Sequence, residues 1–91
     1  MKLKYEDKTY ELHNGDIIGR EKGSSIQILD VPGGSTVSRK HARIEQEGKN
    51  YFVVDLNSKN GTYVNGEKIT RGLLDIGNVV HFGDLEMEVV E

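Results

Sequence analysis

The sequence predicts an all-β protein, an antiparallel β-sandwich or barrel of about ten short strands. Short runs in which apolar and polar residues alternate recur along the chain, and turn signals separate them about every 5 to 12 residues. No stretch shows the apolar spacing of a helix. In folds of this class the connecting loops cluster at the ends of the strands, so we expect the functional residues on loops.

Four short strands are predicted in the first third of the chain, at residues 2–5, 9–12, 17–18 and 26–29. In the first two, alternate apolar residues share one face, and Asp7-Lys8 supplies the turn between them. Asn14-Gly15 predicts a tight turn into the third strand, because both residues tolerate a positive φ. The polar segment 21–25 predicts a loop after Gly19-Arg20, and Pro32-Gly33-Gly34 ends the fourth strand.

The segment 35–47 is long enough to form a helix, because it runs for 13 residues without glycine or proline. Ser38 could cap such a helix. The apolar spacing contradicts it, since Ala42 and Ile44 alternate with charged residues, whereas a helical face that holds Ile44 would also hold Lys40. Residues 42–47 are therefore predicted to form a strand.

The second half continues as strands, predicted at residues 51–56, 63–64, 68–69, 79–82 and 85–90. The continuous apolar run 51–54 predicts a strand covered on both faces. Asn65-Gly66 predicts a hairpin turn, and Gly83-Asp84 joins the last two strands. Residues 72–77 are expected to form a loop with buried anchors at Leu73, Leu74 and Ile76. Exposed strand faces are expected at Arg43, Glu45, Glu86 and Glu88.

The composition is that of one globular domain spanning residues 1–91. A net charge of −3 gives no global field that would draw the chain to nucleic acid or to an anionic membrane. The absence of cysteine excludes disulfides and thiolate metal sites and favours a reducing compartment. No apolar run approaches the roughly 18 residues of a membrane span, and Met1 is followed by polar residues where a secretory signal would be apolar. We therefore expect a soluble, cytoplasmic protein with neither a nucleic-acid nor a membrane partner.

Side chains that can hold an anion gather in the segments next to the strands 42–47 and 51–56. They are Ser38, Arg39 and Lys40 before the first strand, and Ser58, Lys59, Asn60 and Thr62 after the second. A phosphate ester carries about −1.5 to −2 charges and three acceptor oxygens, so a guanidinium fork, hydroxyls and amides hold it best. The groups that suit this chemistry are Arg20, Ser38, Arg39, Lys59 and Asn60.

Taken together, the motifs resemble the signature of forkhead-associated (FHA) domains. The matching pieces are Gly19-Arg20, the segment 38–41 (SRKH), the segment 55–62 (DLNSKNGT), Asn65-Gly66, Gly77 and Phe82-Gly83. They extend over nearly the whole chain. The resemblance implies an eleven-stranded β-sandwich that binds phosphothreonine peptides through loops at one end, without catalytic activity, cofactor or metal. It also implies a signalling role, with a partner protein phosphorylated by a Ser/Thr kinase, and we expect a monomer.

The resemblance also assigns roles to individual residues. Arg20 and Ser38 would contact the phosphate, and Arg39 and Lys59 would add contacts from neighbouring loop positions. Asn60 would hydrogen-bond the peptide backbone beside the phosphothreonine. The residues that would brace the binding loops are Gly19, His41, Gly61, Thr62 and Gly66. The chain departs from part of the family at Lys59, where some members carry a threonine or serine hydroxyl.

Two other classes of protein use residue types present here. Ser38, His41 and Asp55 are the residue types of a hydrolytic triad, but no G-x-S-x-G elbow accompanies them. The same fold could also serve as a phospho-independent interaction module, because a fold does not fix a function.

Metal binding is the remaining alternative. The three histidines, His13, His41 and His81, lie on separate segments without a paired ligand spacing. An EF-hand reading of Asp55, Asn57 and Glu67 fails because the glycine and the glutamate each come one position late.

Overall fold

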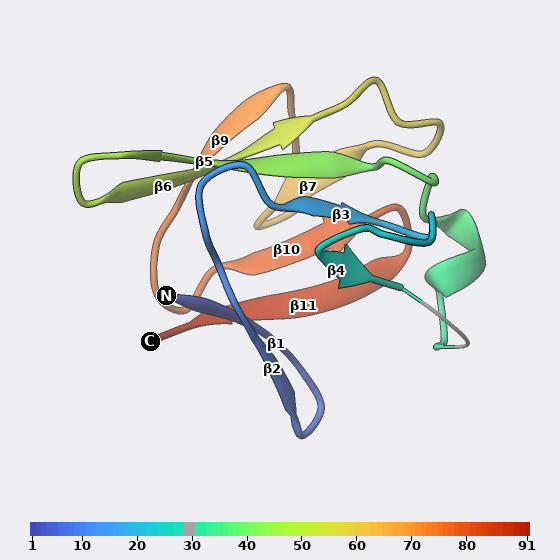
Figure 1. The fold of residues 1–91 in the computed structure, drawn as a ribbon, viewed down its shortest axis with the longest axis horizontal. Coiled ribbons are helices and arrows are strands. Elements are labelled where there is room, and N and C mark those ends of the chain that lie inside the picture. The colour runs from blue at the N-terminus through green and yellow to red at the C-terminus, as the bar shows by residue number, and fades with distance from the viewer. Residues whose placement is uncertain (29–30) are drawn as a thin grey trace.

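The computed structural model describes residues 1–28 and 31–91, and these form two β-sheets packed face to face (Figure 1). The first sheet has the order β2 (Lys8–Glu11), β1 (Lys2–Tyr5), β11 (Leu85–Val90), β10 (Val79–Phe82), β7 (Thr62–Val64) and β8 (Glu67–Ile69). The second has the order β4 (Ile26–Gln27), β3 (Ile17–Gly19), β5 (Ala42–Glu47), β6 (Asn50–Asp55) and β9 (Arg71–Leu74). The predicted all-β sandwich is confirmed. Within the described ranges its one helix is a single 3-10 turn, η1 (Gly34–Thr36), which the sequence patterns did not predict.

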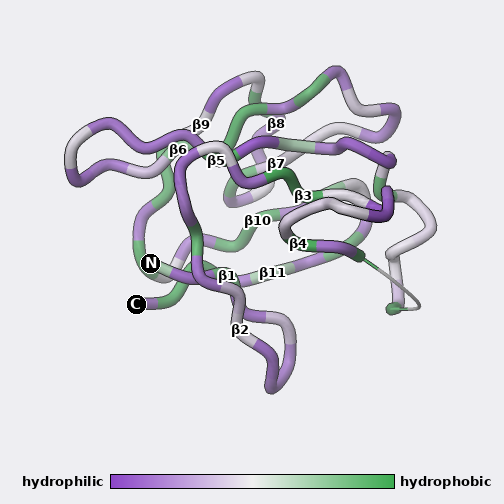
Figure 2. The backbone as a smooth tube through the Cα atoms, in the orientation of Figure 1, coloured by the Kyte–Doolittle hydropathy of each residue, from purple (hydrophilic) through white to green (hydrophobic). Residues whose placement is uncertain are grey.

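The core lies between the sheets and follows the predicted alternation. In β11, Leu85, Met87 and Val89 are buried, while the intervening Glu86 and Glu88 are exposed. Figure 2 shows hydrophobic residues along the strands and hydrophilic residues at the tip of the β5–β6 hairpin. Besides the three β11 residues, the buried apolar side chains are Leu3, Leu12, Ile18, Ile26, Ile28, Val37, Ala42, Ile44, Val53, Leu74, Val80 and Phe82.

The turns lie at or next to the positions that the sequence predicts. Asn65 and Gly66 have φ values of 50° and 83°, and they close the β7–β8 hairpin as predicted. Gly15, at φ 90°, supplies the turn after Asn14, although this turn leads from one sheet to the other and does not close a hairpin. The turn between β1 and β2 lies one residue earlier than expected, because Lys8 already pairs with Tyr5.

One pairing departs from the antiparallel expectation. β3 and β4 run parallel, with Ile18 opposite Ile26, although only residues 20–25 connect them. Parallel strands usually need a longer crossover. Here β4 is only two residues long, and a turn in which the Ser24 backbone N–H donates to the Glu21 carbonyl at 3.0 Å folds the connection back. Leu29, expected to extend this strand, lies outside the described residues.

The expectation that β6 is covered on both faces is wrong. Val53 points into the core and is fully buried, but Phe52 and Val54 are only half-buried on the outer face of the five-stranded sheet. The guanidinium of Arg71 lies 3.7 Å above the Phe52 ring and partly covers it. The apolar run 51–54 therefore has one face in the core and one outer face that the Arg71 side chain partly covers.

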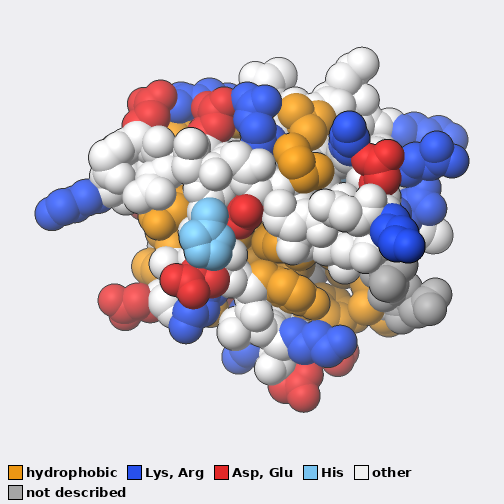
Figure 3. All heavy atoms as spheres, in the orientation of Figure 1, with side chains coloured by type: hydrophobic (Ala, Val, Ile, Leu, Met, Phe, Trp, Pro, Cys, Tyr) orange, Lys and Arg blue, Asp and Glu red, His pale blue; other side chains and the backbone are white. Residues whose placement is uncertain are grey.

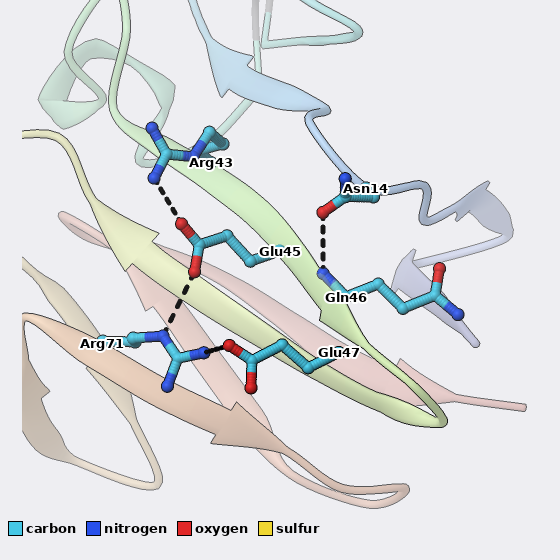
Figure 4. A network of polar contacts seen from close by, with 6 residues as sticks. All are labelled: Asn14, Arg43, Glu45, Gln46, Glu47 and Arg71. Carbon is cyan, nitrogen blue, oxygen red and sulfur yellow. Dashed lines mark hydrogen bonds and ion pairs between the residues drawn. The ribbon is translucent and has the colours of Figure 1, made fainter.

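An ion-pair network extends from Arg71 across the same outer face (Figure 4). Arg71 contacts Glu45 at 3.2 Å and Glu47 at 2.8 Å, and Arg43 pairs with the second oxygen of Glu45. Hydrogen bonds from Arg43 and Arg71 hold the pKa of Glu45 below its usual value. Arg43 and Glu45 thus lie on the outer face of β5, as predicted, and ion pairs fix them there.

Two of the three anchors expected in the segment 72–77 are exposed. Leu74 is buried, but Leu73 and Ile76 are 45% and 56% exposed. Leu73 belongs to the edge strand β9 and pairs with Phe52 on the outer face, while Ile76 lies in the turn that the Asn78 N–H closes on the Asp75 carbonyl. Alternation along β9, not a buried loop, decides which leucine enters the core. Among residues 1–28 and 31–91, no helix has the length and apolar character needed to cross a membrane.

Candidate functional site

Three segments come together at the end of the sandwich opposite the β5–β6 hairpin (Figure 1). They are the β3–β4 loop (20–25), the segment 35–41 before β5 and the β6–β7 loop (56–61). The Arg20 N–H donates to the Ser38 carbonyl at 3.2 Å, and the Lys59 N–H donates to the Ser38 hydroxyl oxygen at 3.0 Å. The Asn60 side-chain amide donates to the Thr36 carbonyl at 2.7 Å. Arg20, Ser38 and Asn60 therefore border one site.

Arg20 is exposed directly after β3, and a hydrogen bond from its side chain to the backbone fixes its orientation. Its Nε donates to the Val37 carbonyl, which fixes the guanidinium but leaves both Nη groups without a partner among the described residues. Gly19, just before it, is buried against the next segment, because a Cβ there would lie 2.6 Å from the Arg39 carbonyl carbon and closer still to its oxygen. The close approach of Gly19 to Arg39 thus sets the position of the Arg20 fork.

Ser38 and Asn60 keep donors that their structural contacts do not use. The Ser38 oxygen accepts the Lys59 N–H, so its own O–H remains able to donate. The Asn60 amide uses one N–H on the Thr36 carbonyl and retains a second N–H and its carbonyl oxygen. Such a pair of groups can bind one anion and one peptide bond.

The remaining predicted cations differ in availability. Arg39 and Lys59 are exposed, and neither meets a carboxylate within the described ranges. Lys40 lies 3.8 Å from Glu21, so its charge is partly neutralised. Gly66 lies in the β7–β8 hairpin, outside the three segments.

His41 connects the segments 35–41 and 56–61 from the side of the core. It is fully buried, its Nδ1 accepts the Ser38 N–H at 2.9 Å, and its Nε2 donates to the Gly61 carbonyl at 2.8 Å. Its ring packs edge-on against Phe82, with 5.7 Å between the ring centroids. Burial lowers the pKa of His41, although the Gly61 carbonyl and the charge of Asp55 partly oppose this effect. The neutral ring therefore fits these hydrogen bonds.

Asp55 organises the β6–β7 loop, a role that the sequence reading missed. Its carboxylate accepts hydrogen bonds from the hydroxyls of Ser58 and Thr62 at 2.6 and 2.7 Å, and from the Ser58 N–H at 3.1 Å. Burial alone would raise the pKa of Asp55, but these bonds outweigh it and the pKa is lowered. Ser58 and Thr62 are among the side chains that could hold an anion, but both hydroxyl protons go to Asp55, and Thr62 thereby ties the start of β7 to the end of β6. An Asp three residues before a Ser is a signal for such a turn.

Thr36 is a second residue that the sequence reading missed. Its hydroxyl donates to the Gly33 carbonyl at 2.6 Å and accepts the Asp84 N–H at 2.7 Å, while its carbonyl accepts the Asn60 amide. A Cβ at Gly83 would lie 2.6 Å from the Thr36 hydroxyl oxygen. The 3-10 turn thus links Asn60 to the β10–β11 turn.

The alternative chemistries do not match these contacts. The hydroxyl of Ser38 contacts the Lys59 N–H, and both ring nitrogens of His41 bind backbone groups, so Ser38, His41 and Asp55 do not form a triad. His13 lies 3.3 Å from Asp16, and His81 lies 3.3 Å from Glu86 on another strand. Within residues 1–28 and 31–91, no three potential metal ligands cluster.

The buried histidine predicts a pH dependence of folding. Because the pKa of His41 is lowered in the folded state from 6.5, the unfolded chain binds the proton first on acidification. Stability is therefore complete above pH 6.5 and falls as the pH drops from 6.5 toward the folded pKa, with a slope of at most about 1.4 kcal/mol per pH unit from this residue. Urea unfolding between about pH 7.5 and pH 5, with an NMR titration of the ring, measures both effects. A ring midpoint above 6.5, or the same slope in a His41→Gln variant, would contradict this account.

The fold and the site geometry together define a class of protein, a β-sandwich module whose loops bring hydrogen-bond donors and cations together at one end. The sequence profile of the FHA domain family matches residues 17–83, and the chain belongs to this family.

Curated proteins are similar to this chain over about three quarters of its length. The chain is 42% identical over 69 residues to the glycogen accumulation regulator GarA of Mycolicibacterium smegmatis, a match that covers 76% of this chain and 41% of the relative. It is 41% identical to the oxoglutarate dehydrogenase inhibitor of Corynebacterium jeikeium, covering 76% of this chain and 45% of that protein. The chain thus spans less than half the length of these curated relatives.

Solved structures show the same fold over nearly the whole chain. One comes from a study of phosphothreonine-dependent FHA domain interactions, with a TM-score of 0.85, 34% identity and coverage of 99% of this chain and 94% of that one. Another is the FHA domain of FhaA complexed with the intracellular domain of Rv3910, with a TM-score of 0.81, 35% identity and coverage of 96% of each chain.

Proposed function

We propose that this chain is a non-catalytic module that binds a phosphothreonine segment of a partner protein and so makes a protein interaction depend on a Ser/Thr kinase. The observation that carries the proposal is the convergence of Arg20, Ser38 and Asn60, each fixed by a backbone contact and each with donors to spare. FHA structures of 34% and 35% identity come from phosphothreonine-dependent interactions and from a complex with an intracellular partner domain. Residues 1–91 would act as one domain, in the cytoplasm where kinases have access to ATP.

The roles follow from the chemistry of each group. The Nη groups of Arg20 and the hydroxyl of Ser38 would bind phosphate oxygens, because charge-assisted bonds to a guanidinium fork are the strongest available. Asn60 would bind the peptide backbone. Arg39 and Lys59 are exposed, and no hydrogen bond among the described residues fixes their side chains, so they would add attraction at lower specificity. Gly19, His41, Gly61 and Thr62 would hold the loops in place, and Gly66 would hold the β7–β8 hairpin.

The affinity expected from these contacts is micromolar. At an effective dielectric of 20, one pair of unit charges about 4 Å apart gains about 4 kcal/mol before desolvation is subtracted. Two such contacts, together with hydrogen bonds from a hydroxyl and an amide, can reach about 8 kcal/mol, which is the free energy of micromolar binding. Because the loops are already held by hydrogen bonds, little of this energy is needed to order them.

A threonine should be preferred over a serine in the same peptide. The extra methyl group gains about 1–3 kcal/mol when a fitted site buries it. We expect a phosphothreonine peptide to bind about tenfold or more tightly than its phosphoserine twin. Calorimetric titration of the two peptides side by side measures the ratio, and equal affinities would refute a methyl pocket.

A second candidate is a phospho-independent interaction through the outer face of the five-stranded sheet. The observation in its favour is the exposed apolar surface there, where Leu73 is 45% exposed beside the half-buried Phe52. The two candidates separate in one experiment. A partner that uses the loops loses binding when its threonine is dephosphorylated, whereas a partner on the sheet face loses binding only when Leu73 is replaced, for example by Leu73→Asp.

A further inference from the structure

The loop end of the molecule carries more positive charge than a single phosphate neutralises. The segments 20–25, 35–41 and 56–61 hold five of the twelve basic residues and one of the fifteen acidic residues. Their formal charge is therefore +4, and that of the rest of the chain is −7. Figure 3 shows Lys and Arg side chains gathered at this end with a single acidic side chain between them. The one acid in these segments, Glu21, lies 3.8 Å from Lys40.

Lys68, on β8, adds a further cation from outside the loops. A Cβ placed at Gly61 would lie 3.2 Å from the Lys68 Cε and 3.1 Å from the Tyr63 hydroxyl, so both side chains lie against Gly61. Tyr63 and Lys68 face each other across the β7–β8 hairpin. Since Gly61 directly follows Asn60, the ammonium of Lys68 lies at the rim of the same site.

Two basic residues on the outer face of the sheet are paired with carboxylates, unlike most of those at the loop end. Arg43 and Arg71 are both paired with glutamates of β5 (Figure 4). At the loop end, by contrast, no carboxylate of the described residues contacts Arg20, Arg39, Lys59 or Lys68. A phosphate ester brings about −1.5 to −2 charges, which leaves about two positive charges uncompensated.

We propose that the phosphothreonine recognised here lies in an acidic segment of its partner, with carboxylates beside the phosphate that pair with Arg39, Lys59 and Lys68. This inference rests on the proposed function and names the chemistry of its ligand. Ion pairs of this kind are exposed and individually weak. They therefore contribute more to ligand selectivity and to the rate of association than to affinity. The net charge of −3 does not oppose an acidic ligand, because screening limits each field to about 8 Å at physiological ionic strength.

Three phosphothreonine peptides that differ only beside the threonine test the proposal. One carries two glutamates there, the second carries glutamines and the third carries lysines, and an unphosphorylated copy of the glutamate peptide is the fourth ligand. We expect the glutamate peptide to bind about three- to tenfold more tightly than the glutamine peptide at low salt, and the lysine peptide to bind most weakly. The glutamate advantage should shrink when the salt is raised, because exposed pairs are screened.

Variants locate the effect on the molecule. Lys68→Gln is expected to reduce the ratio of the glutamate to the glutamine affinity, whereas Lys49→Gln, on the β5–β6 hairpin at the other end, should keep it. Equal binding of the two phosphopeptides by the unaltered chain would overturn the acidic-segment proposal alone. Binding of the unphosphorylated glutamate peptide as tightly as the phosphorylated one, or no binding of any phosphopeptide, would overturn the proposed function and this inference with it.

Discussion

Replacing Arg20 with alanine is expected to weaken phosphothreonine-peptide binding by about 100-fold or more. Two charge-assisted hydrogen bonds from the guanidinium contribute about 1.5–3 kcal/mol each, and a loss of 2.8 kcal/mol corresponds to about 100-fold. The fold should survive, because the Arg20 side chain is exposed and is held by one bond to the Val37 carbonyl. Fluorescence anisotropy with a labelled phosphopeptide measures the affinity, and thermal unfolding checks the fold.

Two companion variants sharpen the result. Arg20→Lys keeps the charge but removes the fork, so an intermediate loss is expected. Lys49→Ala removes a cation from the opposite end and should leave the affinity unchanged. If Arg20→Ala binds normally while its fold is intact, the phosphate site is assigned to the wrong residues.

Replacing Gly19 with alanine is expected to have the largest effect on the fold and the site together. The new Cβ would lie 2.6 Å from the Arg39 carbonyl carbon and 3.0 Å from the Ser38 carbonyl oxygen. A backbone group cannot yield as a side-chain tip can, so we expect about 3 kcal/mol of lost stability or more. The peptide affinity should fall as well, because the Arg20 fork and the Ser38 hydroxyl would be displaced from each other. Urea unfolding and peptide titration measure the two losses.

Gly48→Ala is the matched control for this substitution. Gly48 lies in the β5–β6 hairpin at φ 60°, and nothing lies within 4 Å of an added Cβ, so backbone strain alone would cost about 1 kcal/mol. Its peptide affinity should be unaltered. Equal losses of stability in the two variants would show that the contact between Gly19 and Arg39 is not what makes glycine necessary.

Most strands could be predicted because they depend on local alternation. The strands at 42–47, 79–82 and 85–90 have the predicted bounds, since each has one face in the core and one outside. The sequence predicts a strand at 26–29, but its parallel pairing with β3 and the 3-10 turn could not be found this way, because both depend on contacts between separate segments. Leu73 shows the same limit, since an apolar residue on an edge strand has no sequence mark that separates it from a buried one.

The residue types of the site could be read from the sequence, but not which of them are free to act. Ser38 and Ser58 look alike in the sequence, yet only Ser38 keeps its hydroxyl proton, since that of Ser58 binds Asp55. Lys68 escapes a motif search because it reaches the site from the neighbouring hairpin. Which donors are available depends on neighbours in space that local patterns do not encode.

The most direct test of the central claim is an amide-resolved NMR titration of the chain with a degenerate phosphothreonine peptide library. The account predicts that the amide signals of Arg20, Ser38, Lys59 and Asn60 shift, while those of Phe52 and Leu73 stay in place, and that an unphosphorylated library causes no shift. Shifts confined to the outer face of the five-stranded sheet, or the same shifts without the phosphate, would contradict it.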